Sequence, residues 1–265
     1  MKRGGHCKRG PRHLTREFLV AATTLVAFAT DASGLPGRPW PSVLGSREAF
    51  SPEVSAAVER IWINPTLRRT VNGPPARAPL EVYAAFVDTP EVTAAAARFR
   101  NLGSYHVQAI DDDRYRGDDG DGARGFSHVL RRERQRRIIF SEGAHTGPFL
   151  GTVSGSALTV LDLELHGDWV NPTLTAYVHI DDRVAAALAQ VLVASFGFLA
   201  DQKLVEGLRM TAGVAEWAVE PSGGFCEWLA REPLAAARRH RIVAALPGCV
   251  RARAQLGAAA SEGRR

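Results

Sequence analysis

Histidines and carboxylates are spread along the middle of the chain, where they could take part in acid–base chemistry or hold a metal ion. The histidines concerned are His106, His128, His145, His166 and His179. Their spacing contains neither H-x-H nor H-E-x-x-H, so no single helix or strand assembles a metal site, and we expect none. Glu142 and His145 are close in sequence at an expected strand end, and are the pair best placed to exchange a proton. The alternative is a pair that is only exposed or hydrogen-bonded.

Acidic residues cluster between Asp111 and Gly122 and invite comparison with a calcium-binding loop. An EF-hand loop needs oxygen ligands at its first, third and fifth positions, glycine at the sixth and glutamate at the twelfth. Placing Gly122 at the sixth position puts Gly117 at the first and His128 at the twelfth, and neither residue supplies the required ligand. The pattern therefore predicts a solvated hairpin loop rather than a calcium site.

The segment Ser154-Gly155-Ser156 is superficially similar to the turn that exposes a nucleophilic serine. It lacks the G-x-S-x-G frame and the strand–turn–helix context that such a turn requires. We therefore expect a hairpin turn here, and no nucleophile.

Arginines dominate residues 131–137 (RRERQRR). Such a run could contact anionic head groups, phosphates or nucleic acid. No aromatic residues interleave with it, as they do in single-strand binding surfaces. The favoured interpretation is a charged hairpin turn that protects a sheet edge from further pairing.

The first 29 residues have the features of a secretory signal peptide. Six basic residues precede the apolar run that begins at Phe18, and Ala27-Phe28-Ala29 forms an A-x-A cleavage site. The run is too short to span a bilayer comfortably. The alternative is a buried N-terminal helix. Cleavage would place the mature chain outside the cytoplasm, in a secreted or periplasmic location.

Removing this segment changes the charge of the protein. The whole chain has 33 basic and 28 acidic residues, and residues 1–29 contain six basic residues and one acidic residue, Glu17. The remainder is formally neutral, with 27 of each (33 − 6 and 28 − 1). A nucleic-acid partner is therefore not expected from net charge.

Two of the three cysteines, Cys226 and Cys249, lie outside the expected signal peptide. Their spacing matches no metal motif, and they lack the further ligands of a zinc site. In an oxidising compartment they are expected either to pair in a disulfide, which we favour, or to remain as two free thiols.

Residues 181–218 form the most regular stretch of the chain. They contain no proline, and their apolar residues recur at spacings of three and four, as on one face of a helix. One straight helix would be about 57 Å long at ~1.5 Å per residue, so we expect a break or bend near 195–197, where Gly197 weakens it.

Shorter elements precede this helix. Helices are expected from Ser51 to Asn64 and, after prolines, from residues 79 and 90. From Tyr105 the apolar period changes to two, which predicts antiparallel strands. The expected strands cover residues 105–110, 126–130, 137–142, 149–153, 157–165 and 170–180.

This order of elements resembles the START-like superfamily, which includes Bet v 1 allergens, polyketide cyclases and lipid-transfer domains. The family segment A-P-x-E-x-V/Y-x-x-F-x-D is matched by Ala78-Pro79-Leu80-Glu81-Val82-Tyr83 and Phe86-Val87-Asp88. The resemblance covers roughly residues 70–218. It implies an α+β helix-grip fold, in which a curved antiparallel sheet wraps a long C-terminal helix. The expected divisions are a signal peptide (1–29), a leader with a short helix (30–69), the helix-grip domain (70–220) and a helical, basic tail (221–265).

The function that the resemblance implies is the binding or transport of a hydrophobic small molecule or lipid between sheet and helix. No cofactor is expected. The alternatives are a cyclase or hydrolase acting in the same cavity, and a protein that contacts membrane surfaces through its basic tail. The expected cavity-lining residues are Phe140, Leu161, Leu163, Leu174, Ala176 and Val178 from the sheet, and Val184, Leu188, Leu192 and Phe196 from the helix.

Overall fold

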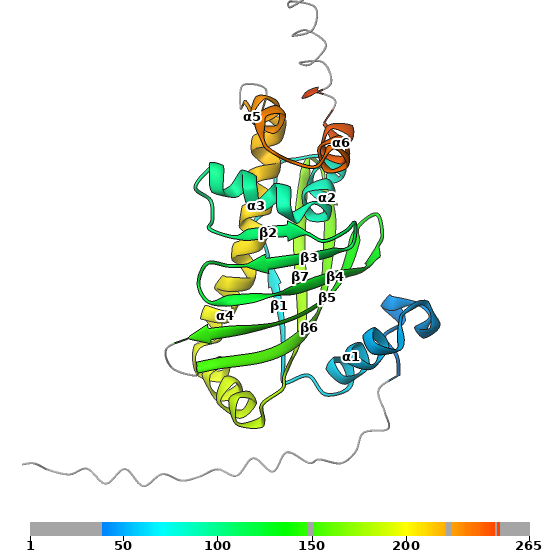
Figure 1. Cartoon of the computed structure of the whole chain (residues 1–265), viewed down its shortest axis with the longest axis vertical. Helices are drawn as coiled ribbons and strands as arrows, with labels where there is room; N and C mark the ends of the chain where they lie inside the picture. The colour runs from blue at the N-terminus through cyan, green and yellow to red at the C-terminus, as the bar shows by residue number, and fades with distance from the viewer. Residues whose placement is uncertain (1–38, 148–150, 221–223, 247, 250–265) are drawn as a thin grey trace, which may run out of the picture. The chain divides into compact units, whose positions relative to one another are not determined.

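A seven-stranded antiparallel sheet forms the centre of the computed structural model, in the order β1-β7-β6-β5-β4-β3-β2 (Figure 1). The structure describes residues 39–147, 151–220, 224–246 and 248–249, with only the backbone of residues 192–200. The strands are β1 (Leu67–Asn72), β2 (His106–Ala109), β3 (Arg114–Asp118), β4 (Ala123–Arg132), β5 (Arg136–Gly147), β6 (Gly151–His166) and β7 (Trp169–Ile180).

Most of the strands agree with the sequence pattern. β6 and β7 pair across the turn at Gly167, with Leu161 opposite Leu174, so the predicted apolar faces coincide. Two details differ. β3 lies within the stretch predicted to be a loop. The sequence pattern did not indicate this strand, because Tyr115 is its only fully buried residue and its other residues are of types common in turns. Residues 154–156 lie inside β6, paired with β5 and β7, so the hairpin turn expected there is wrong.

Three helices cover one face of the sheet, which we call the inner face: α2 (Leu80–Asp88), α3 (Pro90–Phe99) and α4 (Arg183–Val219). α4 is a continuous helix, so the break expected near 195–197 is wrong. A single glycine costs a helix only about 1 kcal/mol, which the flanking turns tolerate. α4 starts at Asp182, whose carboxylate accepts a hydrogen bond from the backbone N–H of Ala185 at 2.7 Å. This is the α+β helix-grip arrangement that the sequence predicted.

The opposite, outer face of the sheet is covered by α1 (Pro52–Ile63). Val58 and Ile61 of α1 are completely buried in a cluster with Ile138, Leu158 and Tyr177 of the sheet. Two short 3-10 turns, Ser42–Leu44 and Arg47–Ala49, precede this helix. A helix in the expected leader thus protects apolar side chains that would otherwise be exposed to water.

Two further helices, α5 (Phe225–Arg231) and α6 (Ala236–Ala245), follow α4. Phe225 packs edge-on against Trp217 of α4, with ring centroids 5.0 Å apart, and Trp228 lies 5.6 Å from the same ring. Both helices therefore belong to the inner core. Of the predicted helical, basic tail, residues 221–223, 247 and 250–265 lie outside the described part of the chain. None of the described helices is both long and apolar enough to cross a membrane.

A disulfide joins Cys226 of α5 to Cys249, 23 positions later, with Cα atoms 5.2 Å apart. Replacing both cysteines with serine is expected to lower the free energy of unfolding by about 3 kcal/mol, because the unfolded chain gains conformational entropy when a loop of this size is no longer closed. Urea denaturation followed by tryptophan fluorescence measures the change. Reduced wild-type protein is the control and should lose the same amount. A double variant with the midpoint of the oxidised wild type would contradict this account.

Candidate functional site

A cavity of about 400 Å³ lies on the inner face of the sheet, next to the packed core. The side chains on the inner face of β6 explain its position, since they become smaller toward the start of the strand. The inward-facing residues are, in order from the core, Leu163, Leu161, Thr159, Ala157 and Gly155. The two leucines are buried, whereas Ala157 and Gly155 line the cavity. Small residues thus leave space where the leucines would fill it.

Four glycines from adjacent strands form a row across the floor of the cavity: Gly117, Gly125, Gly143 and Gly155. A Cβ atom at Gly125 or Gly143 would lie 2.3–2.4 Å from a carbonyl oxygen of the neighbouring strand, and one at Gly155 would lie 2.5 Å from such an oxygen. Side chains are therefore excluded at Gly125, Gly143 and Gly155, where the neighbouring backbones approach closely. A Cβ at Gly117 would meet nothing within 4 Å. The row leaves bare backbone facing the cavity.

Hydroxyl groups are part of the polar lining, which also includes Asp118, Asp119, Arg124, Glu142 and His145. Ser127 and Ser141 lie opposite each other on β4 and β5, with their Oγ atoms 2.9 Å apart. The side chain of Tyr105, which also lines the cavity, lies near Glu206 of α4. Burial, followed by the charge of Glu206, raises the pKa of Tyr105, so this phenol stays protonated near neutral pH.

An ion pair connects the cavity region to α4. The guanidinium of Arg69 on β1 holds both carboxylate oxygens of Asp201, with Nε 2.9 Å from Oδ1. Arg69 lies opposite Ala176, which in turn lies opposite Thr159, so these residues form one row across neighbouring strands. This row lies between the buried leucines of the core and the row that contains Ser141. The pair therefore links the helix to the edge strand at the boundary between packed core and cavity.

Five of the ten residues predicted to line the cavity lie on the inner face of the sheet. Val178 lines the cavity. Leu161, Leu163 and Ala176 are buried, at 5%, 0% and 3% exposure, and Leu174 packs beside the core. These four residues face α4 as predicted. Leu161, Leu163 and Leu174, however, pack in the filled hydrophobic core and do not line an open space.

Three of the other five predicted lining residues lie away from the cavity. Phe140 is a correction: it pairs with Leu158 on the outer face and packs in the cluster beneath α1, because residues 139 and 140 point to opposite faces of β5. Val184 and Leu188 are a second correction, since their side chains are 70% and 45% exposed. The side chains of Leu192 and Phe196 lie outside the described residues.

Sequence reasoning missed the serine pair and the glycine row. Alternation along each strand indicates which residues face inward, but not which residues of different strands lie side by side. That information comes from the register, which places Ser127 opposite Ser141 and Gly125 opposite Gly143.

The proposed acid–base pair is not assembled. Glu142 and His145 are three residues apart on one strand, so their side chains point to opposite faces of β5. Within the described ranges, no group of three histidine, cysteine or acidic side chains is placed to hold a metal ion. The aspartates of the expected loop instead form turns. Asp111 accepts hydrogen bonds from the backbone N–H groups of Asp113 and Arg114, which lower its pKa to about 2.

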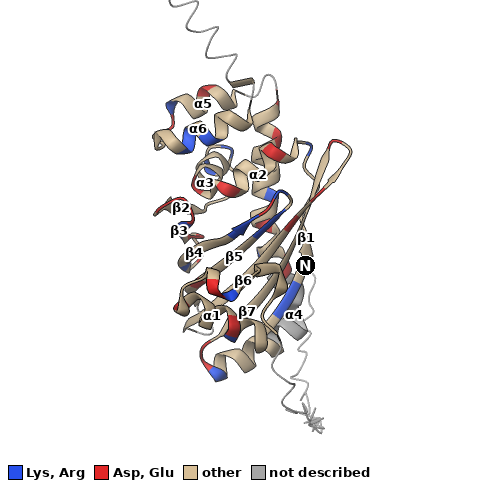
Figure 2. Cartoon of the chain, turned by 90° about the vertical axis from the view of Figure 1, so that its right-hand side faces the viewer, with Lys and Arg blue, Asp and Glu red and all other residues tan. Residues whose placement is uncertain are grey.

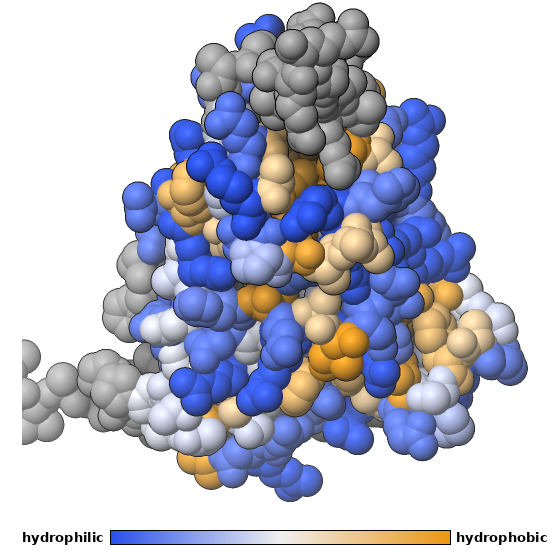
Figure 3. Space-filling view, turned by 45° about the horizontal axis from the view of Figure 1, so that its top comes forward, coloured by the Kyte–Doolittle hydropathy of each residue, from blue (hydrophilic) through white to orange (hydrophobic). Residues whose placement is uncertain are grey.

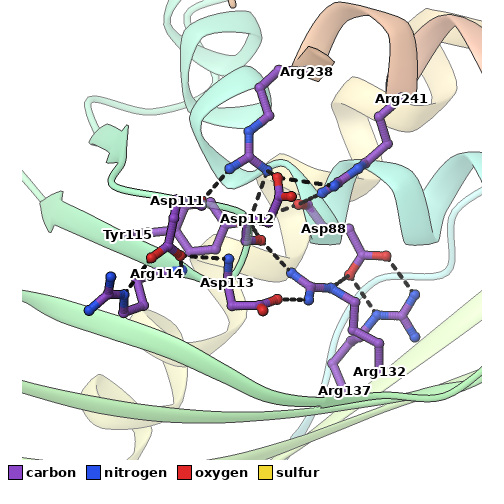
Figure 4. Close-up of polar contacts among 10 residues, drawn as sticks. All are labelled: Asp88, Asp111, Asp112, Asp113, Arg114, Tyr115, Arg132, Arg137, Arg238 and Arg241. Atoms are coloured by element: carbon purple, nitrogen blue, oxygen red, sulfur yellow. Dashed lines mark hydrogen bonds and ion pairs between the residues drawn. The ribbon is translucent and has the colours of Figure 1, made fainter.

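A charged cluster lies beside the core, where α2, the β2–β3 turn, the β4–β5 hairpin and α6 meet (Figure 4). Asp88 at the end of α2 accepts hydrogen bonds from Nε and Nη2 of Arg137, at 2.7 and 2.8 Å, and lies 3.1 Å from Nε of Arg132. Arg132 also pairs with Asp113. Figure 2 shows the arginine-coloured end of this hairpin directed toward α2. The arginine run is therefore largely committed to internal ion pairs.

The same cluster holds α6 in place. The guanidinium of Arg238 is 8% exposed and lies 3.3 Å from Glu91 and 3.5 Å from Asp112. Arg241 lies 3.3 Å from Asp112. Burial raises the pKa of Glu91, although these two arginines oppose the shift. On the face shown in Figure 3, hydrophobic residues are separated by hydrophilic ones. The cluster joins elements and does not present free charges to a ligand.

No protein-family model and no curated protein matches this sequence. Solved structures are similar at low identity. A conserved protein from Geobacillus kaustophilus is 15% identical, with a TM-score of 0.40, over 57% of this chain and 96% of its own. Ara h 8.0201 is 12% identical, with a TM-score of 0.38, over 56% of this chain and 98% of its own.

DynU16, a putative protein in the dynemicin biosynthetic locus, is 18% identical, with a TM-score of 0.30, over 55% of this chain and 49% of its own. These TM-scores are low, so the fold assignment rests on the order and pairing of the elements themselves. By that topology, with a curved antiparallel sheet around a long C-terminal helix, the chain has a START-like helix-grip fold.

Proposed function

We propose that this protein binds a hydrophobic small molecule or lipid in the cavity on the inner face of the sheet. The observation that supports the proposal is the space of about 400 Å³ left where inward side chains shrink from leucine to glycine along β6. Small-molecule sites typically occupy about 300–1,000 Å³ and are concave and mostly apolar. A core built only for stability would be filled by side chains at this position.

The cyclase or hydrolase alternative needs at least two titratable groups that converge in the cavity and exchange protons near neutral pH. The described lining holds Tyr105, Glu142 and His145. Burial, followed by the charge of Glu206, raises the pKa of the Tyr105 phenol, which disfavours its action as a base near neutral pH. Glu142 and His145 lie on opposite faces. The described residues therefore favour a binding protein.

Export of the protein and membrane contact through its basic tail stay predictions. The disulfide between Cys226 and Cys249 supports an oxidising compartment. Residues 1–38, which hold the expected signal peptide, and residues 250–265 at the end of the tail lie outside the described chain. Arg238 and Arg241 of the tail contact carboxylates inside the fold, so they are not free to contact a membrane.

Filling the cavity is expected to abolish ligand binding without unfolding the protein. Ala157→Phe places a ring in the cavity beside Val178, and the affinity for the apolar dye Nile red should fall at least about tenfold, or ~1.4 kcal/mol. Fluorescence titration measures it. Thr175→Phe is the matched control, because Thr175 lies on the outer face of β7 and should leave the affinity unchanged. Equal affinities of both folded variants would contradict the proposal.

Native mass spectrometry of the purified protein, followed by organic extraction, identifies any ligand that remains bound. A stoichiometric apolar compound, lost in Ala157→Phe and retained in Thr175→Phe, is the expected result. A compound retained equally by both variants would place its binding site elsewhere.

A further inference from the structure

The lining of the cavity includes a hydroxyl pair, besides the charged or titratable residues Asp118, Asp119, Arg124, Glu142 and His145. Ser127 and Ser141 are half-buried, and both line the cavity. A hydroxyl has one donor and two acceptor positions, so a pair of hydroxyls 2.9 Å apart uses one donor internally and keeps one O–H free. Among the described side chains, neither hydroxyl has another partner. The free donor matches a carbonyl or hydroxyl oxygen of a ligand.

Charges around the cavity disfavour an anionic ligand. Lys203 of α4 is neutralised by Asp121 at 2.8 Å and Glu206 at 3.7 Å, and Arg124 by Asp118 at 2.7 Å. Lys203 and Arg124 are thus paired, and the lining also holds His145. The acids Asp118, Asp119 and Glu142 line the cavity too, so a ligand carboxylate would lose its hydration among more acidic than basic groups. Moving an unpaired charge out of water costs far more than moving a neutral oxygen that gains a hydrogen bond. The oxygen that fits is uncharged.

The glycine row determines the shape that the cavity accepts. Gly117, Gly125, Gly143 and Gly155 present peptide backbone with no side chains across four neighbouring strands. Such a surface allows close approach by a flat molecule over its whole area. A flexible chain would gain less contact there, and it would also lose the entropy of its rotatable bonds.

We infer that the cavity selects flat, apolar molecules that carry a neutral oxygen, with the Ser127–Ser141 pair as the specificity-determining contact and the glycine row as the floor. This inference rests on the proposed binding function. It adds the class of ligand and the residues that discriminate within it. The serine pair positions the ligand and performs no chemistry on it.

The serine contact is tested with fluorenone and fluorene, which share one flat ring system and differ by a carbonyl oxygen. Equilibrium dialysis of the wild type and of Ser127→Ala/Ser141→Ala measures both affinities. Removing the pair should weaken fluorenone about tenfold, equivalent to ~1.4 kcal/mol, and leave fluorene unchanged or slightly tighter. Both serines are replaced so that no hydroxyl is left without its partner.

The outcomes separate the two proposals. If the wild type binds neither compound, the proposed binding of apolar molecules fails, and the inference fails with it. If both compounds bind and the double variant changes their affinities equally or not at all, the serine contact is overturned while the binding function stands.

The floor is tested with dihexyl ketone, an open-chain ketone with as many carbon atoms as fluorenone and the same carbonyl group. The wild type should bind fluorenone more tightly, although the open chain carries more hydrogen atoms and more apolar surface. Gly117→Leu should weaken fluorenone and keep the fold, because a Cβ at this position meets nothing within 4 Å. Equal or tighter binding of dihexyl ketone, or unchanged fluorenone affinity in the folded Gly117→Leu variant, would overturn the flat floor.

Discussion

Replacing Leu163 with aspartate is expected to leave the protein unfolded. Leu163 is 0% exposed and belongs to the same core cluster as Leu161, Val170 and Leu208. Loss of a buried leucine side chain alone costs about 2–5 kcal/mol, and the new carboxyl must be buried without a partner, at several kcal/mol more. A typical domain is stable by only about 5–15 kcal/mol, so little or no stability would remain. Circular dichroism and urea denaturation measure the outcome.

Leu165→Asp is the matched control. Leu165 lies two residues further along β6 with its side chain on the same face, but it is 47% exposed. Its replacement is expected to change the free energy of unfolding by less than about 1 kcal/mol, as is usual for exposed positions. The core assignment would be wrong if Leu163→Asp folded with near-native stability, or if the two variants lost equal stability.

Asp88→Asn is expected to lower the free energy of unfolding by about 3–5 kcal/mol, the cost of removing one partner from a buried ion pair. The side chain of Arg137 is only 6% exposed, and Asp88 supplies both carboxylate oxygens to it. The amide of asparagine keeps the size of the side chain but removes its charge. The guanidinium of Arg137 would then be buried beside that of Arg132 with no carboxylate between them.

The neighbouring arginine provides the comparison. Arg136 pairs with Asp162 at 2.6 Å, but these side chains are 37% and 33% exposed. Water screens this pair, so Asp162→Asn should cost no more than about 1 kcal/mol. If urea denaturation showed equal losses of unfolding free energy for Asp88→Asn and Asp162→Asn, burial of the Asp88–Arg137 pair would not determine how much the pair stabilises the protein.

Local signals in the sequence were sufficient for most elements. The alternation in β6 and β7 predicted both strands, their pairing and their buried faces, because a period of two directly reports which side of a strand is apolar. Ser51 and Pro52 predicted the start of α1, where the Ser51 side chain accepts the N–H of Val54 at 3.4 Å. The break in α4 was wrong, because one glycine is a weak local signal against a long run of helical residues.

The candidate site depended on relations that no local pattern carries. Val178 lines the cavity, whereas Phe140 was placed on the wrong face because a strand's period does not state which of its two faces meets the helix. Val184 and Leu188 have the helical spacing of a buried face, yet they are exposed. Periodicity shows which residues share a side of a helix, but not which side packs.

The sequence alone determined the α+β class, the order of the elements and the turns between most of them, since these depend on residues close together in the chain. Tertiary structure decided where the cavity lies, because its floor and its hydroxyl pair come from strands brought together by register. It also decided the role of the arginine run. Asp88 and Arg137 are 49 residues apart, and only folding shows that they neutralise each other. Contacts between distant residues depend on packing geometry, which a one-dimensional pattern does not contain.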